Sequence, residues 1–319
     1  MAETTTRTPT RGDTPDNPAQ LSKGTWKDTL KRTLREFKED DLTLLAAALT
    51  YYGVLSLFPA LLVLLSLLGL AGADTIDTLL KNIGSLTPSA ARDVVTNAVH
   101  DLQGANNKAG FAFVAGLVGA LWSASGYVGG FMKASNVIYE VEEGRKFWKL
   151  KPLQIAATVV IMLLTAIIAI SVVVTGPVAE KVGNIVGAGD AAVTVFSIAK
   201  WPVIALIVSL MFAFLYYIGP NVKQPGFKWV SPGGVVAVIL WVIASAAFAF
   251  YVANFGSYSK TYGSMAAVII FLIWLWITNL VMLFGAELNA EIERGRQIEG
   301  GHDADAEPFL PHREPPKES

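Results

Sequence analysis

The sequence predicts an all-α integral membrane protein with six transmembrane helices. Three observations predict this class: the composition, six long apolar stretches, and an uneven distribution of basic residues between the segments that separate them. Of the 319 residues, 53% are hydrophobic and only 16% are charged, which is too little charge to cover a soluble globule of this size. The chain has no cysteine, which excludes disulfides, thiolate metal sites and cysteine nucleophiles.

Six stretches are long and apolar enough to cross a bilayer, whose hydrocarbon core requires roughly 20 residues of helix. None carries Asp, Glu, Lys or Arg in its middle, where such a group costs roughly 2.5–3.5 kcal/mol on insertion scales. The six predicted spans are Leu44–Leu70, Ala112–Met132, Leu153–Thr175, Trp201–Ile218, Val235–Ala253 and Ala266–Phe284.

The basic residues predict the orientation of these spans. Lys and Arg number eight before the first span, five in 133–151, two in 219–229 and four after the last span, against three, two and one in the other loops. Nineteen basic residues therefore lie on one side and six on the other. The positive-inside rule then places both termini in the cytoplasm of a plasma membrane, as an even number of spans requires.

The two ends of the chain differ in composition from the part between them. Residues 1–22 are rich in Thr, Pro, Asp and Asn and contain no apolar run, and residues 297–319 are similarly polar. Both segments are predicted to be disordered cytoplasmic tails. The six-span membrane domain is therefore expected over residues 23–296.

Two kinds of helix are expected outside the spans. In residues 24–38, Trp26, Leu30, Leu34 and Phe37 fall on one helical face and basic residues surround it, which is typical of an amphipathic helix lying on an anionic membrane surface. The outward loop 73–110 contains two patterns of helical spacing. Two short helices at the outer leaflet are predicted there.

The polar stretch NFGSYSKTYGS, residues 254–264, separates the last two spans and is predicted to face outward. Gly256 and Gly263 suit a tight turn between helices, and tyrosines suit the membrane interface. One interpretation is therefore a structural hairpin. The other is a polar mouth for lipid headgroups or an anionic solute, formed by Asn254, Tyr258, Lys260 and Tyr262.

The first two spans carry polar and small residues. Tyr51 and Tyr52 lie at membrane depth in span 1 and Pro59 interrupts its hydrogen-bond ladder. One interpretation is that these residues serve helix packing and kink the helix. The other is that they line a polar transport path. Span 2 has glycines at spacings that favour close helix packing, and the residues concerned are Gly116, Gly119 and Gly126.

The sixth span ends in NLVMLFGAELNAEIER. Asn279 falls within the hydrocarbon zone, and Glu287 and Glu291 are one helical turn apart. A helix end at the interface, with an ion pair between Glu291 and Arg294, is one interpretation. The other makes Glu287 a buried carboxylate that gates a cytoplasmic entrance, together with Asn289, or carries a proton, because ionisable groups inside membranes tend to be functional.

An enzyme is not expected. The three histidines, His100, His302 and His312, are divided between the outward loop and the C-terminal tail, so the spans offer neither a metal-ligand cluster nor a Ser/His/Asp arrangement. The stretch SKT at 259–261 lacks the glycine of a phosphate-binding loop. No cofactor and no metal site is therefore predicted.

Three stretches resemble the YihY/virulence-factor BrkB family of bacterial inner-membrane proteins over roughly residues 25–296. They are AAALTYYGVLSLFPALL, LWSASGYVGGFMKASNVIYEVEEGRKFWKLK and, most specifically, YVANFGSYSKTYGSMAAVIIFLIWLWITNLVMLFGAELNAEIER. The resemblance implies a six-span helical fold with cytoplasmic termini and a link to envelope integrity. This family carries a historical ribonuclease label, but the inward loops offer for such chemistry mainly Glu140, Glu142 and Glu143.

The predicted function is a non-enzymatic membrane protein that moves or accommodates a lipid or another amphiphile. The alternative is a scaffold that binds partners, and a membrane-bound ribonuclease is the least favoured. Membrane lipids are the expected partners, a homo-oligomer is left open, and no nucleic acid is expected. The substrate-path candidates are Tyr51, Tyr52, Asn254, Tyr258, Lys260, Tyr262, Asn279, Glu287 and Asn289.

Overall fold

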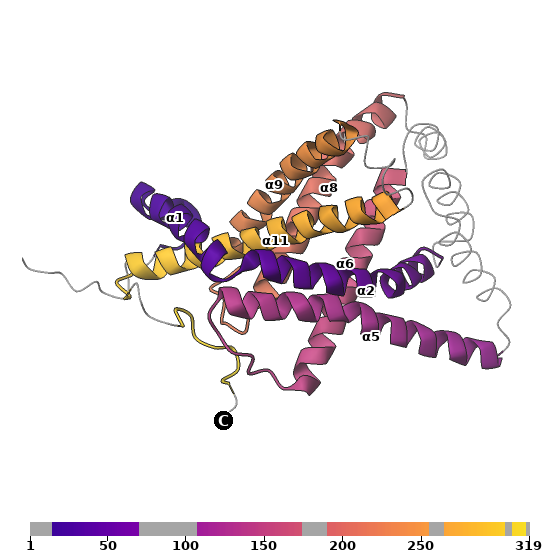
Figure 1. Ribbon diagram of the computed structural model, residues 1–319, viewed down its shortest axis with the longest axis horizontal. Helices are drawn as coiled ribbons and strands as arrows, with labels where there is room; N and C mark the ends of the chain where they lie inside the picture. Colours follow the sequence, from indigo (N-terminus) through magenta and orange to yellow (C-terminus); the bar gives the residue numbers. More distant parts are fainter. Residues whose placement is uncertain (1–14, 70–106, 174–189, 255–264, 304–307, 317–319) are drawn as a thin grey trace, which may run out of the picture. The chain divides into compact units, whose positions relative to one another are not determined.

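The fold is described by a computed structural model for residues 15–69, 107–173, 190–254, 265–303 and 308–316 (Figure 1). Within these ranges the chain forms one short 3-10 helix, η1 (Pro18–Gln20), and seven α-helices, and the only strand-like feature is an isolated antiparallel bridge between Val222 and His312. The helices are α1 (Lys23–Glu39), α2 (Leu42–Gly69), α5 (Asn107–Ile138), α6 (Phe147–Val173), α8 (Asp190–Ile218), α9 (Phe227–Asn254) and α11 (Met265–Glu299).

The all-helical membrane class is confirmed. Four stretches of the described helices are long and apolar enough to cross a membrane: Phe147–Val172, Ile198–Ile218, Phe227–Asn254 and Val268–Glu299. The other two predicted spans fall on α2 and α5, where the described residues contain a shorter apolar stretch, Leu42–Leu57. Six spans therefore stay a prediction, as do the outer-leaflet helices, because residues 70–106 lie outside the described residues.

The chain divides into two compact units. Unit 1 takes residues 1–51, 130–147 and 209–319, and unit 2 takes residues 52–129 and 148–208. Helices α2, α5 and α8 therefore contribute residues to both units, α6 lies in unit 2 except for its first residue, and α1, α9 and α11 belong to unit 1 alone.

Unit 1 is organised around α11, which packs against both α9 and α1 (Figure 1). A cluster formed by Leu21, Trp229, Leu288 and Ile292 fills the contact between these elements. Burying such side chains stabilises by about 1.5–3 kcal/mol each. The C-terminal part of α11 is consequently enclosed by protein, and almost every residue from Gly285 to Gly295 is buried.

Helix α1 turns a polar face toward α11. Ser22 caps it by accepting a hydrogen bond from the Thr25 backbone N–H at 3.1 Å, and its buried residues are Thr29, Thr33 and Glu36. The predicted apolar face is divided: Trp26 packs on the core cluster and Phe37 meets the Phe284 ring edge-on at 6.1 Å, whereas Leu30 and Leu34 are more than half exposed.

In unit 2 the described residues form an apolar cluster of their own. Val63, Ala124 and Met162 are buried together, with alanines and leucines of α2 and α5 packed against them. The Lys151 ammonium donates to the Ser125 hydroxyl at 2.6 Å and lies 4.4 Å from the centre of the Trp122 ring. The hydroxyl and the ring thus stabilise the charge of Lys151 near the beginning of α6, a helix long enough to span a membrane.

Candidate functional site

The C-terminal half of α11 presents the greatest concentration of buried polar groups in unit 1. Asn289 lies where α11 crosses α9 and is 1% exposed. Its side chain accepts a hydrogen bond from the Gly233 N–H at 2.8 Å and donates one to the Val230 carbonyl at 2.9 Å. Both groups belong to the backbone of α9 beside Pro232, so the Asn289 amide joins two helices through their main chain.

Two glycines allow this crossing. A Cβ atom added to Gly233 would lie 2.1 Å from the Gly285 carbonyl oxygen, and one added to Gly285 would lie 2.5 Å from the Tyr216 hydroxyl. The Tyr216 hydroxyl itself donates to the Met282 carbonyl at 2.7 Å. The backbones of α9 and α11 therefore approach to a distance that excludes any side chain.

One turn further along α11, a charged network connects α11 with α1 and with Glu140 in the loop after α5. Arg32 donates to the carboxylate of Glu291. Arg294 pairs with Glu140 at 3.0 Å, and its Nε lies 3.5 Å from Glu291. These groups are buried or half-buried, so breaking one pair would leave its partner charged in a poorly solvated place, which is costly.

Glu287 lies in α11 one helical turn before Glu291, at the edge of this network. It is 1% exposed, and its Oε2 makes no hydrogen bond within the described part of the chain. The charges that act on it are Asp40, Glu291 and Glu36, which repel it, and Arg294, which attracts it. A buried carboxyl in such surroundings is unfavourable when charged, and such groups cluster at functional sites.

Asp40 extends the acidic side of the network at the junction of α1 and α2. Burial, and then the nearby carboxyls of Glu36 and Glu140, raise the pKa of Asp40 to about 7, against the opposing effect of Arg294. Asp40 therefore changes charge near neutral pH, which an ordinary aspartate does not.

The loop after α5 holds a second polar cluster. Arg145 is buried and donates to the carbonyls of Ile218 at 3.0 Å and Gly219 at 2.8 Å, which end α8. Glu143 accepts from Arg145 at 2.7 and 2.8 Å and from Asn136 at 3.0 Å. Burial raises the pKa of Glu143, but the hydrogen bonds from Arg145 outweigh it and leave that pKa below its ordinary value.

The C-terminal segment 308–316 packs onto this loop, although the sequence places it in a disordered tail. Phe309 stacks on Tyr139 at 5.7 Å and lies 4.9 Å from the Arg294 guanidinium. Arg313 donates to the Tyr217 carbonyl at 3.0 Å, and the Asn221 amide donates to the Glu314 carbonyl at 2.8 Å. The segment therefore contacts the charged network at Arg294. The predicted division into a membrane domain and two tails stays a prediction.

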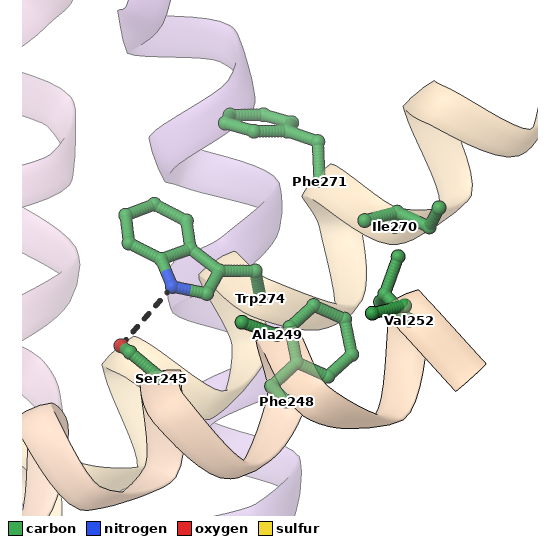
Figure 2. A pocket seen from close by; sticks show the side chains of 8 residues that line it. Ser245, Phe248, Ala249, Val252, Ile270, Phe271 and Trp274 are labelled. Atoms are coloured by element: carbon green, nitrogen blue, oxygen red, sulfur yellow. Dashed lines mark hydrogen bonds between the residues drawn. The ribbon is translucent and has the colours of Figure 1, made fainter. Parts of the chain in front are cut away.

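A groove lies between α9 and α11, toward their connection and far along α11 from the charged network. Its volume is about 790 Å³ and its lining is almost entirely apolar. Figure 2 shows the Trp274 indole reaching from α11 to Ser245 on α9, with which it forms a hydrogen bond of 3.3 Å. The lining residues are Ser245, Phe248, Ala249, Val252, Ala253, Ile270, Phe271 and Trp274.

The sequence-predicted site residues are distributed as follows. Tyr51 is 63% exposed and Tyr52 is half-buried. Asn254 is exposed and donates to the Phe250 carbonyl of its own helix at 2.8 Å, whereas Asn279 is fully buried and donates to the Thr50 hydroxyl at 3.1 Å. Glu287 and Asn289 are both buried in α11, but Asn289 bonds to α9, whereas the charged neighbours of Glu287 include Asp40 and Glu36. Five candidates lie outside the described residues: Gly256, Tyr258, Lys260, Tyr262 and Gly263.

The predicted roles of the glycine and proline candidates stay predictions. Helix α2 continues through Pro59. A Cβ added to Gly116 or Gly119 would meet no described atom within 4 Å, and one added to Gly126 would only reach the Ser56 hydroxyl at 4.0 Å. Close packing is observed at Gly233 of α9 and Gly285 of α11, which the sequence analysis did not select.

Sequence reasoning also missed three polar residues that carry contacts in unit 1: Arg32, Arg145 and Asn221. Within the described ranges, no group of three His, Asp or Glu side chains is placed to hold a metal ion.

Comparisons with known proteins agree with the membrane fold. The family described as virulence factor BrkB matches residues 33–309. The chain is 34% identical to the ribonuclease-like protein YfkH of Bacillus subtilis over 79% of this chain and 90% of that protein. It is 28% identical to a UPF0761 membrane protein of Alteromonas mediterranea over 81% and 85%, and 27% identical to one of Vibrio campbellii over 81% and 80%. No solved structure matches the chain.

Proposed function

Because this chain belongs to the virulence factor BrkB family of membrane proteins, we propose that it moves or accommodates a lipid or another amphiphile in the bacterial inner membrane. The support is the structure of α11. One end of this helix lines an apolar groove, and its other end carries a buried charged network. An amphiphile has an apolar and a polar part, and α11 offers a place for each.

The proposed topology has six spans with both termini in the cytoplasm, because four described stretches satisfy the requirements of a span and basic residues mark one side. At about 1.5 Å per residue, 20 residues counted from Val268 cross a core of roughly 30 Å and end near Glu287. The charged network then lies at the cytoplasmic boundary. Helix α1 would rest on the inner leaflet through its exposed leucines, Leu30 and Leu34.

In this proposal Glu287 is the central residue of the inner mouth. It is buried, one of its oxygens lacks a hydrogen bond in the described chain, and the carboxyls of Asp40 and Glu36 are among its charged neighbours. A proton taken up by Glu287 would weaken the repulsion among the neighbouring carboxyls. The outer mouth is proposed to be formed by Asn254, Tyr258, Lys260 and Tyr262.

The test measures movement of a fluorescent phospholipid across liposomes that contain the purified protein, with and without a proton gradient. We expect faster movement than in empty liposomes, and a Glu287→Gln variant that no longer responds to the gradient. Glu142→Gln is the matched control, because Glu142 is an exposed carboxylate in the same unit. Folded protein that moves no lipid would overturn the proposal.

A membrane scaffold is the second candidate, and one observation favours it. Asn279 and Asn289 are fully engaged in contacts between helices, as expected of packing rather than of a path. A membrane-bound ribonuclease is the least favoured candidate, because Arg145 and Asn136 engage the Glu143 carboxylate. RNA cleavage by purified protein, abolished by Glu142→Gln or Glu143→Gln, would revive it.

A further inference from the structure

We propose that the groove between α9 and α11 binds one acyl chain of a membrane lipid. The proposal rests on the proposed function only in taking the ligand to be a lipid, and binding there does not require that the lipid be moved. The groove has the size usual for small-molecule sites, about 300–1,000 Å³. It is open along one side rather than enclosed, so a long chain can enter laterally.

The lining defines the chemistry of the ligand. Its side chains are aromatic and aliphatic except for the Ser245 hydroxyl and the Trp274 indole N–H, and these two groups bond to each other at 3.3 Å. Figure 2 shows this bond at one end of the groove, with Val252 and Ile270 toward the other end and Phe248 between them. Burying a headgroup or another charged ligand there would cost its hydration without compensation. The ligand is therefore an apolar chain.

The position of the groove defines the source of that chain. Both helices belong to stretches that satisfy the requirements of a membrane span. Apolar residues of the same two helices surround the groove and are exposed, Phe250 at 73% and Val268 at 52%. The groove is thus continuous with a surface that faces hydrocarbon in a bilayer, where lipid acyl chains are the surrounding solvent.

Two alanines make the groove hollow. Ala249 and Ala253 both line it, and an indole or phenyl ring in either place would occupy the space that the chain fills. Ala247 is exposed on the same helix but does not line the groove. It provides a control that adds the same side chain at nearly the same depth.

The experiment uses the full chain in liposomes of phosphatidylethanolamine and phosphatidylglycerol. A trace of phosphatidylethanolamine carries a photoactivatable diazirine in one acyl chain, and mass spectrometry locates the cross-linked residues. Because a bound chain competes with bulk lipid only through better packing, we expect about fivefold more cross-linking within 245–253 and 270–274 than elsewhere on these helices. Ala249→Trp should remove this excess and Ala247→Trp should retain it.

Ala253→Phe serves as a second variant, in case Ala249→Trp does not fold. Cross-links spread evenly along α9 and α11, or equal cross-linking of both tryptophan variants, would overturn the proposal. So would a protein dimer that Ala249→Trp dissociates, because a second copy would then occupy the groove. Cross-linking in the groove without lipid movement would refute transport alone, and lipid movement without such cross-linking would refute the groove alone.

Discussion

Replacing Asn289 by leucine tests whether this residue joins α9 to α11. Leucine has a similar volume but can neither donate nor accept a hydrogen bond. The substitution removes the bond from the Gly233 N–H at 2.8 Å and the bond to the Val230 carbonyl at 2.9 Å. Both backbone groups are in buried residues, so they would be left without these partners.

The expected loss of stability follows from these two bonds. A buried polar group left unsatisfied costs about 1–3 kcal/mol, which gives about 2–6 kcal/mol for the pair. Side-chain hydrogen bonds between membrane helices average about 0.6 kcal/mol, which gives a lower limit near 1 kcal/mol. We expect the free energy of unfolding to fall by about 2–4 kcal/mol, because both backbone groups lie within α9, whose own hydrogen-bond ladder limits the cost.

The assay is reversible unfolding of the purified protein in mixed micelles, followed by circular dichroism as the denaturant fraction rises. Asn254→Leu is the matched control. The Asn254 amide is exposed and bonds only to a carbonyl of its own helix, so its loss should change stability by less than about 0.5 kcal/mol. A change below about 0.5 kcal/mol for Asn289→Leu as well would refute the structural role of Asn289.

Three further predictions concern unit 1. Gly233→Ala places a methyl 2.1 Å from the Gly285 carbonyl oxygen and should lower the free energy of unfolding by about 1–3 kcal/mol or more. Gly119→Ala is the control, because its methyl meets no described atom, and it should be neutral or stabilising. Equal effects of the two substitutions would contradict the close crossing of α9 and α11. Because the pKa of Asp40 is raised from 3.8 to about 7, its contribution to stability is full below pH 3.8 and is lost as the pH rises through 7. The stability of Asp40→Asn relative to the unaltered protein should therefore increase between pH 5 and 8 in thermal unfolding. Two proteins whose stability changes with pH in parallel would refute the raised pKa. The charged groups that act on Asp40 are Glu36, Glu39, Glu140 and Arg294. Phe309→Ala removes a ring stacked on Tyr139, worth about 1 kcal/mol, and should speed proteolysis of the C-terminal segment, whereas the exposed His302→Ala should not.

The membrane class could be predicted from the sequence because it depends on local properties. A run of apolar residues crosses a bilayer whichever helices lie beside it, so composition and length were sufficient for α6, α8, α9 and α11. The same reasoning identified the end of α11 as a place where acids and an arginine approach one another. The pair between Glu291 and Arg294 was predicted from their spacing and is observed at 3.5 Å.

The partners of those groups come from distant parts of the chain, and no local pattern reveals them. Arg32 reaches Glu291 across 259 positions, and Asn289 reaches Gly233 across 56. The same is true of the glycines: Gly116 and Gly119 have the expected spacing but no close neighbour among the described atoms, whereas Gly233 has one.

The sequence by itself therefore determined that this protein is helical and resides in a membrane, because hydrophobicity acts on each segment independently. Only the tertiary structure decided which polar residues are buried and what they contact. It turned Thr29 and Thr33 of α1 inward, left Leu30 and Leu34 exposed, and buried Glu287. The energy of a polar group depends on the partner that meets it after folding, and that partner is set by the packing of whole helices.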